Sequence, residues 1–264
     1  MYRLIILVLV FILGGCQKEA AEQPQAQTEA PPVLAKAVDA TAAIAATVNH
    51  PDRSETDRAR DDKRRPAAVM GFARFRPGTT VLDFFAGGGY YTELLARLVG
   101  EDGKVISHNP QFFYDNYDDG SLAKRLANNR LANVVEYKKE FDDLGLEENS
   151  LDAIFAGMII HDLQRMTPDP DATLLQLFEA LRSGGFMLIT DHAAPEGTGN
   201  AMALESGGEH RIEDAFVITQ MEAAGFELAT RSDLLHVAED DRSKAFFRMD
   251  GAPTDRFVLL FKKP

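Results

Sequence analysis

The stretch VLDFFAGGGYYTELLAR, residues Val81 to Arg97, decides the fold of this chain. It begins with a short apolar run typical of a buried strand and ends with helical spacing that puts Leu94 and Leu95 on one face. The turn between them, Ala86 to Gly89, has almost no side chains. Glycine lets the backbone come close to a ligand, and the first turn of a helix offers free N–H groups. A strand, a glycine loop and a helix in this order therefore predict a nucleotide-binding corner.

Strand and helix patterns alternate along the rest of the chain, from Arg76 to Pro264. Short apolar runs predict strands at Thr80–Phe84, Lys104–His108, Val134–Tyr137, Ala153–Ala156, Phe186–Asp191, Glu227–Arg231 and Arg256–Lys262. Helical spacing predicts helices at Tyr91–Val99, Ser121–Asn129, Asp171–Leu181 and Arg211–Ala224. Alternation with connections of this length indicates a doubly wound α/β fold, in which a mostly parallel seven-stranded sheet is covered on both faces.

The first residues have the layout of a signal peptide. A basic start at Arg3 precedes an apolar core, Leu4 to Leu13, of about ten residues, which is too short to cross a bilayer. Leu13-Gly14-Gly15-Cys16 follows and resembles a bacterial lipobox, which implies cleavage before Cys16 and a lipid on its thiol. An ordinary secretory signal or a short anchor is the alternative. Cys16 is the only cysteine, so a lipid there leaves no thiol for a disulfide, a nucleophile or a metal.

Composition divides the chain into four parts. Residues 1–15 are the expected signal peptide, and residues 16–32, rich in Gln, Glu, Ala and Pro, are an expected lipid-anchored disordered tether. Residues 33–75 are an expected helical segment, and residues 76–264 form the main domain. Gln17 follows the cysteine, which by resemblance to enterobacterial sorting favours the outer over the inner membrane. We therefore expect an exported, periplasmic protein held to a bacterial membrane by the lipid on Cys16.

Charge limits the partners of this chain. It carries 41 acidic and 28 basic side chains, a formal net charge of −13. Such a surface repels phosphate backbones, which argues against nucleic acid as a partner. The mixed run Arg58 to Arg65 is either a solvated helix face or a lid that places an arginine over a ligand pocket. The sequence leaves both readings open, and it does not fix the oligomeric state.

Three segments in order resemble the class I S-adenosylmethionine-dependent methyltransferases. The glycine motif of that family falls on four positions: Asp83, Phe85, Gly87 and Gly89. Leu181 to Phe186 looks like the turn before the fifth strand, and Asn149 to Ile154 looks like the entry to the fourth. The resemblance implies a doubly wound fold, S-adenosylmethionine as the cofactor and a small molecule as the methyl acceptor.

Further segments are similar to a bacterial group of often exported methyltransferases. They are Gly87–Leu95, His161-Asp162, Asp191-His192, His210-Arg211-Ile212 and Asp255 to Pro264. Two positions depart from the family pattern. Phe85 replaces a glycine, and Asn109 stands where an acidic residue usually accepts hydrogen bonds from both ribose hydroxyls. A neutral amide lacks the charge-assisted bond, which is roughly twice as strong, so weak cofactor binding or a different ligand stays open.

The resemblance also implies roles in binding the cofactor. Asp83 would orient the glycine loop and meet the ammonium of the methionine moiety, and residues 140 and 141 would hold the adenine. A tyrosine at the start of the helix would lie near the sulfonium through cation–π attraction, with plain helix packing as the alternative. The predicted cofactor-binding residues are Asp83, Gly87, Gly89, Tyr90, Asn109, Glu140 and Phe141.

Four of the six histidines follow strand ends: His108, His161, His192 and His210. In an open α/β sheet the ligand lies beyond these ends, so we predict that at least one of them is functional. By resemblance His161 faces the methyl group, and we expect it to be the base for a hydroxyl or amine acceptor. Asp162 is its candidate partner if the chain turns between them, and a helix N-cap otherwise.

His192, His210 and Arg211 are predicted to line the acceptor pocket. A metal site built from the strand-end histidines would require ligands at a spacing that this sequence does not show, so we predict no metal. Metal-assisted hydrolysis is kept as a third hypothesis, which would require a bound metal. The second is a lipid-anchored module that binds a small molecule without methylating it, which export and the two motif departures favour.

Overall fold

The computed structural model describes residues 32–204 and 208–264. The predicted signal peptide, the lipid on Cys16 and nearly all of the tether lie outside these residues. None of the helices in the described ranges is both long and apolar enough to cross a membrane.

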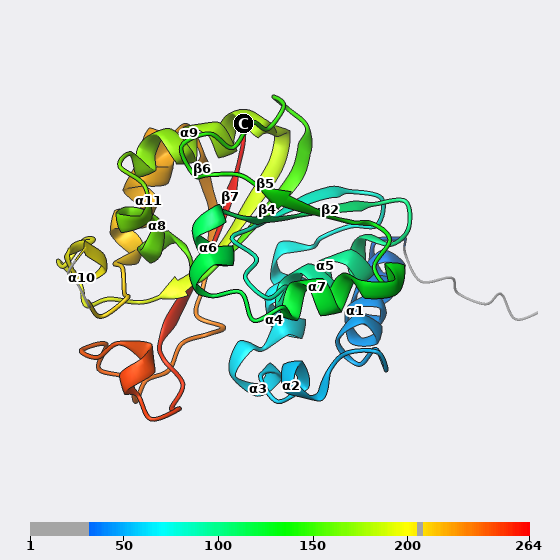
Figure 1. The fold of residues 1–264 in the computed structure, drawn as a ribbon, viewed down its shortest axis with the longest axis horizontal. Helices are drawn as coiled ribbons and strands as arrows, with labels where there is room; N and C mark the ends of the chain where they lie inside the picture. Colours follow the sequence, from blue (N-terminus) through cyan, green and yellow to red (C-terminus); the bar gives the residue numbers. More distant parts are fainter. Residues whose placement is uncertain (1–31, 205–207) are drawn as a thin grey trace, which may run out of the picture.

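A seven-stranded sheet with the order β3-β2-β1-β4-β5-β7-β6 forms the centre of the molecule (Figure 1). The strands are β1 Thr80–Phe84, β2 Lys104–Asn109, β3 Val134–Lys138, β4 Leu151–Gly157, β5 Leu181–His192, β6 Glu227–Ser232 and β7 Arg256–Lys262. The five from β3 to β5 in this order pair in parallel, and β7 runs antiparallel to both of its neighbours. The predicted doubly wound α/β fold is confirmed.

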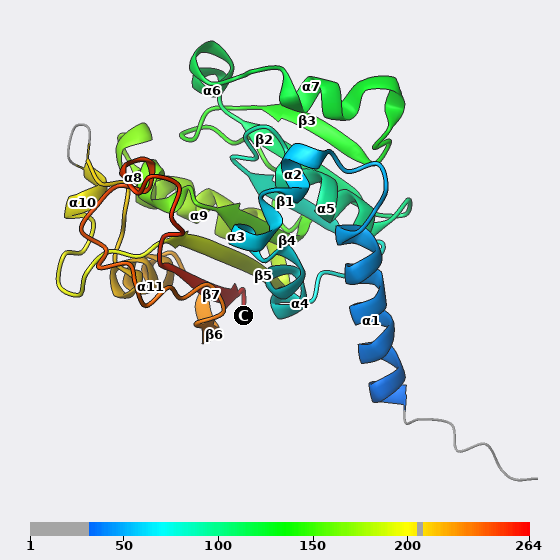
Figure 2. The same ribbon diagram turned by 90° about the horizontal axis from the view of Figure 1, so that it is seen from below.

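Helices cover both faces of the sheet, and each face has its own apolar core (Figures 1 and 2). One face carries α1 Pro32–Val48, α4 Pro66–Ala73 and α5 Tyr90–Val99. The other carries α8 Ile160–Met166, α9 Pro170–Ala180 and α11 Asp214–Ala223. Shorter helices are α2 Glu55–Arg58, α3 Asp61–Arg64, α6 Gln111–Asn116, α7 Ser121–Leu126 and α10 Ala201–Leu204. The predicted helices ahead of the sheet are present.

Some element boundaries differ from the sequence prediction. Strand β5 begins at Leu181 rather than Phe186, because the predicted turn is an excursion within the strand in which Gly184 has a φ of +74°. Helix α11 begins at Asp214 rather than Arg211, since Ile212 first pairs with Ala193 as an isolated bridge. Helices α6 and α8 were not predicted, because each is too short for its spacing to stand out.

A buried carboxylate holds three arginines beneath the glycine loop. Glu93, in α5, has no exposed surface and accepts hydrogen bonds from Arg97, Arg125 and Arg130. The two bonds from Arg130 are both 2.7 Å long and that from Arg97 is 2.9 Å. Burial alone would raise the pKa of Glu93, but hydrogen bonds from Arg130 and Arg97 lower it to about 2.

Arg125 extends this cluster to two other parts of the chain. Its Nε donates to the carbonyl oxygen of Gly88 at 3.1 Å, and its Nη1 lies 2.7 Å from Oδ2 of Asp57 in α2. The glycine loop, the helix after it and the segment before the sheet are therefore tied together through one guanidinium.

We expect Glu93→Gln to destabilise the fold by about 3–5 kcal/mol, because it leaves buried arginine charge without its partner. The difference from wild type should be full above pH 4.5, the ordinary pKa of the group, and should disappear as the pH falls towards 2. Urea unfolding from pH 2 to 7 measures this, with the exposed Glu101→Gln as the control. A loss no greater than that of the control would show that the cluster contributes little.

Candidate active site

A cavity of about 490 Å³ opens beyond the carboxyl ends of β1 and β4. This is where ligands bind in open α/β sheets. Its lining combines the glycine loop, the start of α8, the segment before the sheet and the loop that leads into β7. The lining residues used below are Arg60, Lys63, Arg64, Asp83, Phe85, Gly87, Tyr90, Tyr91, Phe155, Met158, His161, Asp162, His192, Phe246, Thr254 and Arg256.

The glycine loop has the left-handed backbone that its sequence implies, including at the position that is not glycine. Phe85 has a φ of +57°, Gly87 of +57° and Gly89 of +82°. A left-handed backbone is costly for a bulky residue, of order 1–3 kcal/mol, so Phe85 needs compensation. Its ring supplies this by packing on Phe113 and Phe141, with ring centres 5.9 and 5.8 Å apart. A Cβ on Gly89 would come within 2.9 Å of Leu122, so a side chain does not fit there.

Asn109 holds the glycine loop from the end of β2. Its Oδ1 accepts a hydrogen bond from the N–H of Gly87 at 2.8 Å, and its Nδ2 donates to the carbonyl oxygen of Gly87 at 3.1 Å. The side chain is fully buried and does not line the cavity. Both polar atoms of the amide are thus used by the loop. Each atom keeps one further hydrogen-bonding site, but the side chain is fully buried, so the predicted contact with ribose stays a prediction and would require the amide to become accessible from the cavity.

Asp83 lies at the end of β1 and faces the cavity, although only 2% of it is exposed. Its Oδ2 accepts a hydrogen bond of 2.6 Å from Thr92, whose hydroxyl also lies 3.2 Å from that of Ser107. Burial raises the pKa of Asp83 to about 7, against the hydrogen bond from Thr92 and the positive charges of two arginines, Arg64 and Arg125. A cationic group in the cavity would stabilise the ionised form.

Several residues singled out from the sequence lie outside the cavity lining, among them Glu140, Phe141 and His108. Glu140 is exposed and accepts a hydrogen bond from the N–H of Gln111. Phe141 is buried and packs against Phe84 and Phe85. His108 is buried under the loop, with Nε2 2.9 Å from the carbonyl oxygen of Lys139, and burial lowers its pKa to about 4. His108 is therefore neutral and structural, while the adenine roles of the other two stay predictions.

The guanidinium groups of three arginines pack over the ring of Tyr90. The Cζ atoms of Arg64, Arg60 and Arg53 lie 4.6, 5.1 and 5.4 Å from the ring centre. The hydroxyl donates to Asp61 at 2.6 Å. The arginines answer the question that the sequence left open for Arg58 to Arg65: this run supplies cavity lining rather than a plain solvated face. The predicted contact of Tyr90 with a sulfonium stays a prediction.

His161 is held by a buried carboxylate. Its Nδ1 lies 2.6 Å from Oδ1 of Asp191, and its backbone N–H donates to Oδ2 of the same residue at 2.9 Å. Its Nε2 is buried without a hydrogen-bond partner, 3.4 Å from Oδ2 of Asp162. Burial alone would lower the pKa of His161, but the negative charges of Asp191 and the nearby Asp162 raise it to about 10. The ring is therefore protonated at neutral pH.

A turn after β4 allows this pair to form. Met158 has a φ of +59°, and α8 begins at Ile160, so His161 and Asp162 lie in the first turn of a helix rather than on opposite faces of a strand. No side chain caps this helix, so Asp162 is not its N-cap. The structure therefore brings the two predicted catalytic residues together at the cavity wall.

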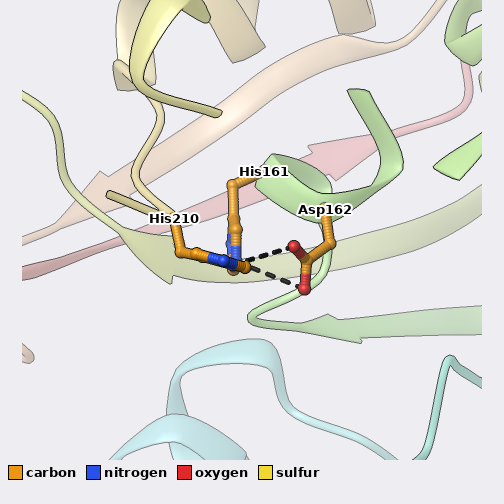
Figure 3. A group of neighbouring side chains, drawn as sticks. All are labelled: His161, Asp162 and His210. Atoms are coloured by element: carbon orange, nitrogen blue, oxygen red, sulfur yellow. Dashed lines mark ion pairs between the residues drawn. The ribbon is translucent and has the colours of Figure 1, made fainter. Parts of the chain in front are cut away.

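His210 completes a group of three with them, in which both imidazole rings point toward the carboxylate of Asp162 (Figure 3). Its Nδ1 is 3.0 Å from Oδ1 of Asp162, and one ligand atom from each residue lies within 4.8 Å of the others. A metal would fit these distances. However, Nη2 of Arg165 lies 2.5 Å from the same Oδ1 and 3.0 Å from Nδ1 of His210. A cation thus already occupies this position, which favours an ion-pair network, and absence of a metal stays a prediction.

The other two residues predicted to line an acceptor pocket differ in their placement. His192 faces the cavity, with Nδ1 2.8 Å from the hydroxyl of Thr254 and its ring stacked on Phe246. Arg211 is fully buried away from the cavity and forms an ion pair with Asp240 at 2.8 Å. Its remaining N–H groups donate to backbone carbonyls. The prediction that Arg211 contacts substrate is not supported, because its donors are used inside the protein.

Arg256, at the start of β7, is a cavity residue that the sequence did not indicate as functional. The strand pattern predicts that Arg256 lies at the start of β7, but it does not predict that the side chain lines the cavity. Met158, from the loop after β4, and Phe246, from the short 3₁₀ helix Phe246–Arg248, also line the cavity and belong to no recognisable motif. The only sequence signal was the resemblance of the segment from Asp255 to Pro264, which did not assign a role to any residue in it.

Comparison with known proteins identifies the family. A family model described as a methyltransferase domain matches residues 75–224, which is more than half of the chain. The chain belongs to this family, and its class is that of the S-adenosylmethionine-dependent methyltransferases of class I fold. The predicted cofactor, S-adenosylmethionine, is confirmed as the cofactor of this family.

Individual relatives agree with the family. The ubiquinone/menaquinone biosynthesis C-methyltransferase UbiE of Escherichia coli is 30% identical over 126 residues, which are 46% of this chain and 45% of that protein. The match thus spans less than half the length of the curated relative. A methyltransferase structure from Aquifex aeolicus superposes with a TM-score of 0.58 at 21% identity, over 84% of this chain and 97% of that one. The [4+2]-cyclase SpnF has the same fold, with a TM-score of 0.57 at 17% identity over 76% and 81%.

We expect Asn109→Asp to weaken binding of S-adenosylhomocysteine rather than to tighten it. Aspartate cannot donate to the carbonyl of Gly87, so the variant loses a buried hydrogen bond worth about 1–3 kcal/mol and places charge against an oxygen. Urea unfolding and calorimetric titration measure the two effects. Asn116→Asp, at an exposed asparagine of α6, is the matched control. Tighter binding in Asn109→Asp would instead support the predicted contact with ribose.

Proposed function

We propose that this protein transfers a methyl group from S-adenosylmethionine to a small molecule bound beside His161. The observation that carries this proposal is one cavity lined both by the motif residues Asp83 and Gly87 and by the His161–Asp162 pair. Methyl transfer from a sulfonium is an in-line displacement, so holding the acceptor and the methyl group in line supplies much of the rate. The similarity to methyltransferases favours this function over the non-catalytic binding module.

Within this proposal His161 and Asp162 handle the proton of the acceptor. Because the ring of His161 carries a proton at neutral pH, its deprotonated form, which becomes more populated as the pH rises, takes the proton of the acceptor on Nε2. Asp162 is the weaker base, since its pKa lies below its usual range although burial alone would raise it. The imidazolium then stabilises negative charge on the acceptor. Asp191 acts as a positioning residue, because it fixes the ring of His161 from the side away from the cavity.

The first experiment is calorimetric titration with S-adenosylmethionine and S-adenosylhomocysteine, followed by transfer of labelled methyl to a panel of phenols, amines and carbon acids. His161→Gln and Asp162→Asn should lower the transfer rate about 10²–10⁴-fold, the usual contribution of general acid–base catalysis. Their affinity for S-adenosylhomocysteine should stay near that of wild type. No binding of either cofactor form by the wild-type protein at millimolar concentration would rule out the proposed function.

Binding of S-adenosylhomocysteine should depend on pH through Asp83. Below its pKa of about 7 the group is protonated in the free protein, and the ligand's ammonium favours the ionised form. Affinity should therefore rise by up to about tenfold per pH unit as the pH approaches 7, and level off above it, with protons released on binding. Titration in buffers of different ionisation enthalpy measures the release. Asp83→Asn should abolish it, and an unchanged release in this variant would assign the proton to another group.

We also propose export and attachment to a bacterial membrane through the lipid on Cys16. The support is the sequence from Leu13 to Cys16 and the tether after it. Cys16→Ser should move the full-length protein from the membrane to the soluble fraction of cells, because one acyl-bearing residue is the whole anchor. Continued membrane association of the variant would contradict lipidation. Metabolic labelling with a fatty acid gives an independent measurement.

A further inference from the structure

Four cationic side chains line the cavity of a chain whose net charge is −13. They are Arg60, Lys63, Arg64 and Arg256. The first three come from the segment at α2 and α3, which lies near the carboxyl ends of β1 and β4 in Figure 2, and the fourth comes from the start of β7. Elements distant in sequence thus bring like charges to one wall. Such crowding is unfavourable unless an anion is bound between them.

The acidic residues of the same segment are already paired elsewhere. Asp61 forms a bidentate pair with Arg53, with oxygen–nitrogen distances of 2.7 and 2.8 Å. Asp57 pairs closely with Arg125, at 2.7 Å, and lies farther from Arg60, at 3.6 Å. The surrounding acids therefore leave most of the positive charge at the cavity uncompensated.

Two of the four cations, Lys63 and Arg64, contact groups without charge. Nζ of Lys63 donates to the carbonyl oxygen of Gly251, and the guanidinium of Arg64 lies over the rings of Tyr90 and Tyr91. Across residues 32–204 and 208–264, neither has a carboxylate within ion-pair distance. Their charges are available to a ligand.

Arg256 gives the second, independent sign of a ligand. It is only 7% exposed and lines the cavity, and its Nε is buried without a hydrogen-bond partner. Its Nη2 donates to the carbonyl oxygen of Lys63. A buried guanidinium nitrogen without a partner is costly, and an anion that binds this guanidinium from the cavity would offset the cost.

The cofactor alone does not balance these charges. S-adenosylmethionine brings an ammonium and a sulfonium against a single carboxylate, so it adds positive charge to the cavity. The two acidic residues in the lining are Asp83, which the ammonium would engage, and Asp162, which already contacts His161 and Arg165. The remaining ligand, the methyl acceptor, is the one that can supply negative charge.

We infer that the methyl acceptor is an aromatic anion, an aryl carboxylate or aryl phosphate, whose charged group binds Arg60, Arg64 and Arg256. This inference rests on the proposed function and specifies its substrate class. The aromatic body follows from the apolar part of the lining, which is Phe85, Tyr91, Phe155, Met158 and Phe246. Arginine suits both headgroups, because its planar fork binds carboxylate and phosphate in the same bidentate manner.

The test is titration of protein loaded with S-adenosylhomocysteine, using hydroxybenzoates, hydroxyphenyl phosphates and the neutral hydroxybenzamides. The affinity of the acids should be at least about tenfold higher than that of the amides of the same shape, as expected for charge-assisted hydrogen bonds. The relative affinities of carboxylates and phosphates then identify the headgroup. Arg60→Gln and Arg64→Gln should each remove most of this preference, measured as the ratio of acid to amide affinity in the same variant.

Arg76→Gln is the matched control, because this exposed arginine precedes β1 at the opposite end of the strand from the cavity. Arg256→Gln should also remove most of the preference. If Arg256→Gln does not fold, Arg256→Lys, which keeps the charge at the buried position, is used instead and should retain part of the preference. Equal affinity for acids and amides, or binding of neither by protein that does bind S-adenosylhomocysteine, would overturn the inference and leave the proposed function intact.

A further comparison separates acceptor from cofactor. The compound 5′-methylthioadenosine lacks the amino-acid group of the cofactor. Arg64→Gln could weaken binding of S-adenosylhomocysteine but not of 5′-methylthioadenosine, and leave the acid preference unchanged. In that case the cations bind the cofactor's carboxylate. That outcome would also overturn the inference. If S-adenosylhomocysteine does not bind to the wild-type protein at all, the proposed function fails first.

Discussion

The buried carboxylate of Glu93 is the interaction on which the cavity depends. Its charge offsets three guanidinium groups, and one of these, Arg125, also contacts Gly88 and Asp57. The glycine loop and the wall formed by the segment before the sheet are therefore positioned by the same ion pairs. A buried charge is stable only when it is well paired, so these contacts act together rather than as separate bonds.

Charge inside the cavity has the opposite sign to charge on the molecule as a whole. The chain is acidic, whereas the cavity wall combines arginines with an imidazolium at His161. An acidic exterior slows the approach of anions at long range, so selectivity here depends on short contacts within the cavity. The lining also contains two carboxylates, Asp83 and Asp162.

Local patterns predicted most of the fold, and long-range pairing decided what they could not show. The strand, glycine loop and helix around Asp83 were predicted because periodicity and glycine content are local properties. His161 and Asp162 were found because they are adjacent and follow a strand. The substrate role of Arg211 was not supported, because its burial depends on Asp240, far along the chain. Neither the use of Asn109 by the glycine loop nor the direction of Arg256 could be read from neighbouring residues.

The cavity is lined partly by residues of the region shared with the methyltransferase family and partly by residues outside it. The region shared with the methyltransferase family, residues 75–224, contains the glycine loop and the His161–Asp162 pair, but neither Arg60 and Arg64 nor Arg256. The cationic wall thus comes from chain on either side of the shared region. If the cationic wall binds the acceptor, exchange of the flanking segments would change which acceptor is chosen. The same segments supply β6, β7 and part of both apolar cores, so a truncation to the shared region would remove part of the fold together with the selectivity.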